Sequence, residues 1–179
     1  MNRVRASVLA ISWVAAAGVL AAAGAIQVTP VVADGRVSAS FVAPSTFGDD
    51  IRAAVRSGLV VTFTYNLELR RPSAVWFDHT IGASTVASAV KYDNLTGVYQ
   101  VSKAQDGHVT WSERTTEDAR VRTWMTSFER VPIGTSERLE PNAEYYVRIR
   151  LQASPKLTFS LVPWSADMAT GRADFTFIP

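Results

Sequence analysis

The segment from Leu59 to Arg70 alternates strictly between two kinds of side chain. An extended chain here would present a dry face and a mostly wet face: Leu59, Val61, Phe63, Tyr65, Leu67 and Leu69 against Val60, Thr62, Thr64, Asn66, Glu68 and Arg70. Alternation with one apolar face is typical of an antiparallel strand, because parallel sheets are buried on both sides. A chain built around this strand is expected to be mainly β.

Shorter segments with the same alternation flank it, and two helices interrupt them. The expected strands are Arg36–Val42, Ala74–Ile81, Ala87–Tyr92, Val98–Lys103, Val109–Arg114, Glu144–Gln152, Leu157–Val162 and Ala173–Ile178. Asp106-Gly107 predicts a hairpin turn. We therefore expect an antiparallel β-sandwich-like or open-barrel domain with two short helices.

The first helix is predicted in the segment from Phe47 to Gly58, where Gly58 supplies a stop. In the second helix an apolar stripe follows helical spacing, at Val121, Trp124, Met125 and Phe128. Thr115 with Asp118 resembles a capping box at its start. We interpret the Trp and Met stripe as core packing against the sheet.

The N-terminal residues predict export. Arg3 and Arg5 precede an uncharged stretch that ends in small residues, so residues 1–25 are predicted to be a signal peptide or a signal anchor. Cleavage after Ala25, cleavage after Ala33 and retention all stay open. Residues 26–36 are predicted to be a tether, and residues 37–179 a single mostly-β domain. The expected location is extracytoplasmic, either periplasmic or anchored to the inner membrane.

Charge and cysteine content remove several classes of function. The chain has 179 residues with 18 basic and 16 acidic side chains, and the two extra arginines lie in the leader. A neutral exported domain lacks the basic character of a nucleic-acid binder. Because there is no cysteine, disulfides, thiolate metal sites and cysteine nucleophiles are excluded.

Candidate catalytic residues are few. Asp78 and His79 are neighbours on an expected strand, so they would point to opposite faces. His108 follows the predicted turn, and Asp93 lacks the alternating acidic ligands of a calcium loop. The sequence contains no nucleophile elbow, P-loop or dinucleotide fingerprint. We therefore predict no enzymatic activity, no metal and no cofactor.

Paired arginines form the one cluster that suggests a site. Arg70 and Arg71 end one long expected strand, and Arg148 and Arg150 share the outer face of another. If those strands are neighbours, the guanidinium groups could bind a carboxylate, a phosphate or a partner protein. The alternative is cross-strand pairing with acidic residues of the same domain: Glu68, Glu137, Glu140 or Glu144.

A series of motifs resembles one known family. In order, they are Ser57-Gly58 before the long strand, Arg70-Arg71 at its end, the segment Tyr92-Asp93-Asn94-Leu95-Thr96 with Tyr99, and Tyr146 with Arg148 and Arg150. This order resembles an uncharacterised family of exported bacterial proteins, domain-of-unknown-function family 4390. The resemblance covers about residues 37 to 162 and implies an envelope location, but no activity, catalytic residue or cofactor.

Two functional expectations follow. The first is a non-enzymatic protein-interaction or envelope accessory module, whose partner is an envelope or inner-membrane protein. The alternative is a carrier of a lipid or other apolar ligand, which requires an apolar cavity of about 300 to 1,000 Å³ between the sheet and the Trp124 helix. An enzyme would require His79 or Asp93 to converge with other polar groups in a cleft.

Overall fold

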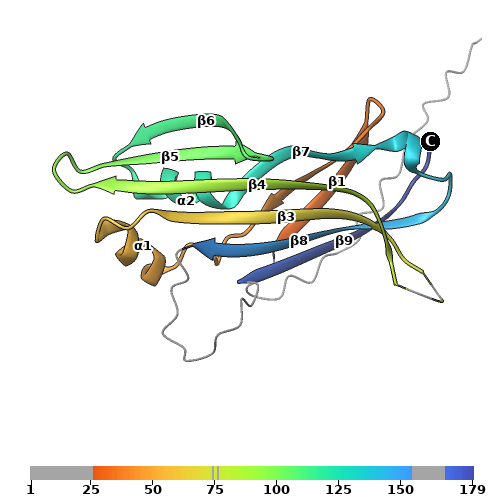
Figure 1. The fold of residues 1–179 in the computed structure, drawn as a ribbon, viewed down its shortest axis with the longest axis horizontal. Coiled ribbons are helices and arrows are strands. Elements are labelled where there is room, and N and C mark those ends of the chain that lie inside the picture. Colours follow the sequence, from red (N-terminus) through yellow and green to blue (C-terminus); the bar gives the residue numbers. More distant parts are fainter. Residues whose placement is uncertain (1–25, 74, 76, 155–167) are drawn as a thin grey trace, which may run out of the picture.

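The computed structural model describes residues 26–73, 75, 77–154 and 168–179. Strands dominate this part of the chain, as the sequence predicts (Figure 1). The elements are β1 (Gln27–Ala33), β2 (Arg36–Val42), α1 (Asp49–Arg56), β3 (Val61–Arg71), β4 (His79–Asp93), β5 (Val98–Gln105), β6 (His108–Thr115), α2 (Asp118–Thr126), β7 (Ser127–Thr135), the 3-10 turn η1 (Ser136–Arg138), β8 (Glu144–Ser154) and β9 (Ala169–Thr176).

The described strands form two antiparallel sheets. The larger has the order β6-β5-β4-β3-β8-β9 and the smaller has the order β1-β2-β7. Neither closes into a barrel within the described residues, since β6 and β9 are the edges of one and β1 and β7 of the other. Figure 1 shows β3, β4 and β8 side by side along the long axis, with α1 at one end and the β3–β4 loop at the other.

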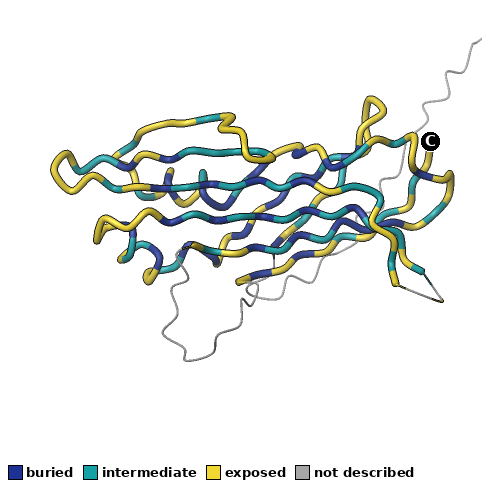
Figure 2. Tube along the Cα trace, in the orientation of Figure 1, coloured by how far each residue is buried: buried dark blue, intermediate teal, exposed yellow. Residues whose placement is uncertain are grey.

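The inner face of the larger sheet carries the core. The inward side chains of β3 are at most 1% exposed, which confirms the alternation from Val61 onward (Figure 2). Leu59 lies before the strand and is 45% exposed. The cover comes from β2, β7 and both helices, through residues that include Phe41, Ile51, Val121, Met125 and Phe128. The polar side chains of β3, which alternate with the buried ones, therefore lie on the outer face of the sheet.

Two layers approach closely where the chain has glycine. A Cβ atom added to Gly82 of β4 would lie 2.4 Å from the carbonyl oxygen of Ile133 in β7. One added to Gly171 of β9 would lie equally close to the carbonyl oxygen of Ile26. Only glycine permits such an approach of two backbones.

The predicted tether is wrong for most of its length. Residues 27–33 form β1, which pairs with β2 along its whole length. Asp34 and Gly35 both have positive φ, at 51° and 72°, and make the two-residue turn between the strands. Pro30 is compatible with this strand because β1 is an edge and its free side needs no N–H donor.

The second helix is shorter than its apolar stripe predicts. It ends at Thr126, and Phe128 belongs to β7, opposite Phe41 of β2. The capping box does not form either. Glu117 is the N-cap and has no side-chain cap bond, while the Thr115 hydroxyl accepts from the Glu117 N–H. Pairing with β2 gives the backbone after Thr126 its hydrogen bonds, and this tertiary gain overrides the helical spacing.

The remaining strands are mostly as predicted. One long strand, β4, takes in residues 79–81 and 87–92, so it joins the second of the two expected segments to the end of the first. The strand expected from Ala74 begins only at His79. β5, β6 and β8 match their predictions, and the Asp106-Gly107 turn forms with positive φ at both residues. The C-terminal strand is β9, paired with β8. The strand predicted at 157–162 lies outside the described residues.

Candidate functional site

The outer face of the larger sheet brings three of the four predicted arginines together. Arg70 of β3 lies opposite Tyr146 of β8, and Glu68 lies opposite Arg148. The neighbouring pair is Asn66 and Arg150. The two strands are adjacent, which was the condition for a cluster.

These arginines surround one carboxylate. Arg148 and Arg150 donate to the two oxygens of Glu68 over 2.5 and 2.6 Å, and Arg70 Nη1 lies 3.7 Å from it. We call Glu68, Arg70, Arg148 and Arg150 the arginine network. The Glu68 side chain is only 19% exposed, so its charge is held between the guanidinium groups.

The arginine network already holds a carboxylate of the protein itself. Burial alone would raise the pKa of Glu68, but the hydrogen bond and charge of Arg148, with Arg150 and Arg70, outweigh it and hold the pKa below its ordinary value. The Nε donors of Arg70 and Arg148 have no partner among the described residues, yet both atoms are shielded from solvent. An external anion would have to displace Glu68 to reach the same donors.

Arg71 lies apart from the network. Its guanidinium donates to both oxygens of Glu140, over 2.5 and 2.7 Å. That hydrogen bond, with the Glu140 charge, raises the pKa of Arg71 and lowers the pKa of Glu140. Glu68 and Glu140 are two of the acidic residues expected to pair with the arginines within the domain. All four arginines therefore have an acidic partner in the same domain.

The base of the β3–β4 loop is held by Asp78. Its carboxylate accepts from the Tyr146 hydroxyl and from the Ser73 N–H, and its carbonyl accepts from Arg70 Nη2 at 2.8 Å. The Tyr146 hydrogen bond, then that of Ser73, lowers the pKa of Asp78. Arg172 of β9 stacks over the Tyr146 ring at 3.8 Å. We call Ser73, Asp78 and Tyr146 the loop clasp.

The loop beyond the clasp presents apolar side chains to solvent. Val75 is 81% exposed and Phe77 is 89% exposed. The sequence predicts a strand over Ala74–Ile81, in which such residues would be half buried, but the described residues between Pro72 and Asp78 are not in a strand.

The candidate catalytic residues do not assemble. Asp78 points to Tyr146, while His79 is exposed and lies opposite Arg71. Asp93 is exposed and accepts from the Leu95 and Thr96 N–H groups, which closes the β4–β5 turn and lowers the Asp93 pKa. Within the described residues, no three His, Asp or Glu side chains lie close enough to hold a metal ion.

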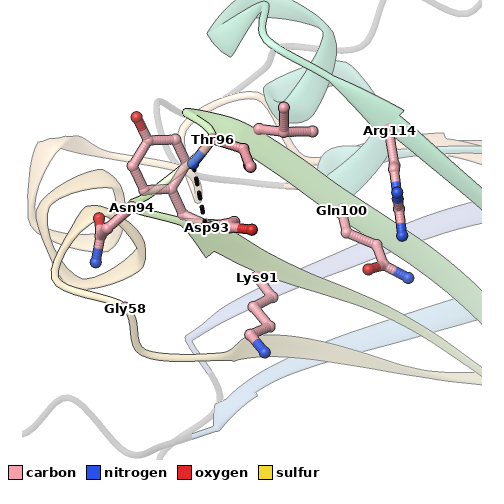
Figure 3. A pocket seen from close by; sticks show the side chains of 9 residues that line it. Gly58, Lys91, Asp93, Asn94, Thr96, Gln100 and Arg114 are labelled. Carbon is pink, nitrogen blue, oxygen red and sulfur yellow. Dashed lines mark hydrogen bonds between the residues drawn. The ribbon is translucent and has the colours of Figure 1, made fainter.

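A pocket of about 790 Å³ (Figure 3) lies beside the β4–β5 turn, at the end of the larger sheet away from the β3–β4 loop (Figure 1). Lys91 of β4, Gln100 of β5 and Arg114 of β6 line it and lie directly opposite one another across three strands. Gly58 and Asn94 lie at its far side (Figure 3). We call Lys91, Gln100 and Arg114 the cationic row. Sequence reasoning did not single out any of its members.

The apolar side chains of α2 pack against the sheet. Val121 and Met125 are fully buried, and the carbonyl of Met125 accepts from the hydroxyls of Tyr65 and Ser88 at 2.9 Å. Trp124 packs edge-on against Trp111 of β6, with ring centroids 4.9 Å apart. The predicted core role of this stripe fits these contacts. The 790 Å³ pocket is therefore distinct from the cavity that the carrier reading requires.

Comparisons with known proteins show only the family. Neither the curated proteins nor the solved structures contain a match to this chain. Among the described residues, no helix is long and apolar enough to cross a bilayer. A family model matches residues 22–157, a range that includes β1 and the motifs from Ser57-Gly58 to Arg150 but stops before β9. The match spans well over half of the chain, so the protein belongs to the family described as Domain of unknown function (DUF4390).

Proposed function

We propose that this protein is a non-enzymatic interaction module of the bacterial envelope, and that the β3–β4 loop is its docking element. The leader expected at residues 1–25 supports the location. The two-sheet arrangement is read as sandwich-like, with the smaller sheet and the helices as the second layer. The observation that carries the proposal is the 89% exposure of Phe77 beside the 81% exposure of Val75.

The base of the loop is tied to the sheet. Asp78 makes two side-chain hydrogen bonds at the base, to groups from β8 and from the loop itself. A loop of this composition would lower its free energy by folding its apolar groups onto the protein. The clasp opposes that collapse, which is the arrangement expected when the apolar groups are needed by a partner.

A protein partner fits the surroundings better than an anionic membrane. The basic side chains close to the clasp are all engaged by carboxylates of the same domain: Arg71 by Glu140 and Arg172 by Asp174. Arg70 shares Glu68 with Arg148 and Arg150. A polybasic surface would be required for attraction to anionic lipids. An aromatic anchor within a polar rim is typical of a protein interface.

Photo-crosslinking in the native envelope tests this. A photoreactive phenylalanine replaces Phe77 in the full chain, and the control places it at Leu95, an apolar side chain that is 97% exposed at the β4–β5 turn. We expect a discrete protein adduct from position 77 and none from position 95. A second variant, Val75→Asp, should abolish the adduct from position 77.

Three results would contradict the proposal. Absence of an adduct at position 77 would remove the docking element. Equal adducts at both positions would show that any exposed apolar residue reacts. Adducts with lipid alone would assign the loop to the membrane surface instead.

A further inference from the structure

We propose that the pocket at the cationic row is a binding site for a small polar ligand with a carboxylate or phosphate group. It is separate from the docking loop, because it lies at the other end of the outer face, where β4, β5 and β6 approach the β4–β5 turn (Figure 3). The inference does not depend on the proposed function.

The row gathers three donors on one side of the sheet. Lys91 is opposite Gln100, and Gln100 is opposite Arg114. Directly opposite residues have Cβ atoms about 5 Å apart, so an ammonium, an amide and a guanidinium group can reach one ligand. These three side chains lie on adjacent strands and on the same face of the sheet.

The donors of the cationic row are not used in hydrogen bonds with the described part of the chain. Among the residues that the structure describes, the side chains of Lys91, Gln100 and Arg114 make no hydrogen bond or ion pair. Arg148 and Arg150 on the same face both donate to Glu68. An anion can therefore bind at the row without displacing a carboxylate of the protein.

Asp93, the acidic residue among those described in the pocket lining, already accepts hydrogen bonds from the backbone. Asp93 accepts from the N–H groups of Leu95 and Thr96, and the second bond is drawn in Figure 3. These bonds lower its pKa, so it stays charged and offsets one of the two cations. One net positive charge remains, which suits an anionic group on a ligand with further hydrogen-bonding atoms.

The far wall gives the pocket its shape. Gly58 ends α1 with φ of +93°, a conformation that side chains other than glycine rarely adopt. It returns the chain toward β3 beside Asn94, whose amide adds a polar group to the lining. The volume of about 790 Å³ is in the range of small-molecule sites.

The test is an NMR titration of the full chain in an uncharged detergent. The probes are inorganic phosphate and citrate, each compared with sodium chloride at the same ionic strength. The reporters are the side-chain amide of Gln100 and the Nε–H of Arg114. We expect saturable shifts with a Kd on the order of 1 mM for at least one probe, because the contacts are few and open to solvent.

Matched variants make the result specific. Lys91→Gln with Arg114→Gln should weaken binding about tenfold or more, since each removes a charged donor, and Gln100 remains as the reporter. Arg36→Gln is the control, because Arg36 is an exposed cation at the start of β2 and away from the pocket. It should leave the affinity unchanged.

The outcomes separate the sources of the anion. Saturation by phosphate alone assigns a phosphoryl ligand, and saturation by citrate alone assigns a carboxylate. Shifts equal to those in chloride, shifts that never saturate, or shifts that persist in the double variant would each overturn the proposal.

Discussion

The two ends of the outer face use the same kind of side chain in opposite ways. In the arginine network, three guanidinium groups surround Glu68. In the cationic row, Lys91 and Arg114 stand on either side of an uncharged Gln100. A carboxylate in direct contact makes the first group structural. The second group makes no hydrogen bond or ion pair with the residues that the structure describes, which leaves its donors available. Density of charge in the sequence therefore does not indicate which cations can bind a ligand.

The largest expected effect comes from removing the centre of the network. Glu68→Gln leaves three partly buried guanidinium groups without their carboxylate, so we expect the free energy of unfolding to fall by about 2 kcal/mol. Urea denaturation measures it. Glu113→Gln, at an exposed position of β6, is the control and should change the free energy by less than about 0.5 kcal/mol. Equal effects of the two variants would show that the network is not structural.

At low pH the wild type and Glu68→Gln should differ less in their free energy of unfolding. The folded protein holds the pKa of Glu68 below its ordinary value of 4.5, so the unfolded chain takes up the proton first as pH falls. The stabilisation is fully present above pH 4.5 and is lost as pH falls through the folded pKa. Unfolding of the wild type and Glu68→Gln, compared from pH 7 to pH 3, should show a constant gap above pH 5.5 and a narrowing gap below 4.5. Other carboxylates are common to both proteins and cancel.

The loop clasp should contribute less. Tyr146→Phe removes the hydrogen bond to Asp78 but keeps the ring, which is 2% exposed and stacked under Arg172. We expect a loss of about 1 kcal/mol and faster hydrogen exchange at the Ser73 N–H. Tyr92→Phe, on the same sheet, is the matched control and should leave Ser73 exchange unaltered. Unchanged exchange in Tyr146→Phe would mean that the clasp does not hold the loop.

The smallest effect is expected at the cationic row. Lys91→Gln and Arg114→Gln should each alter the free energy of unfolding by less than about 0.5 kcal/mol. Neither side chain makes a hydrogen bond or ion pair with the described residues, and the attraction between Lys91 and Asp93 joins two exposed groups. The same denaturation assay measures it. A loss above about 1 kcal/mol in either variant would make the row structural like the network, and the comparison between the two ends would fail.

The sequence was sufficient for features that depend on local pattern. The alternation of β3 placed five core side chains correctly, and Asp106-Gly107 located a hairpin. The same signal occurs at Asp34-Gly35, and it could have identified β1. Pro30 concealed that strand, because proline argues against a strand unless an edge position is already known.

The register between β5 and β6 could not be predicted from the local sequence pattern. Gln105 pairs with His108, so an uninterrupted hairpin would place Gln100 opposite Glu113. The register shift between Lys103 and Ala104 inserts one residue into β6 and brings Arg114 there instead. A single extra residue moves each following side chain to the other face. The bulge places Arg114 opposite Gln100 and so completes the cationic row. The local sequence pattern gives no sign of the bulge.

The first described residue is already part of the folded domain. Ile26 is bonded through its N–H to the carbonyl of Thr170, 3.1 Å away, and β1 begins at the next residue. If the expected leader were retained, the chain would enter the domain at a residue that is already hydrogen-bonded to β9. If the leader were cut, a cut after Ala33 would excise a whole strand, whereas a cut after Ala25 would leave the small sheet complete.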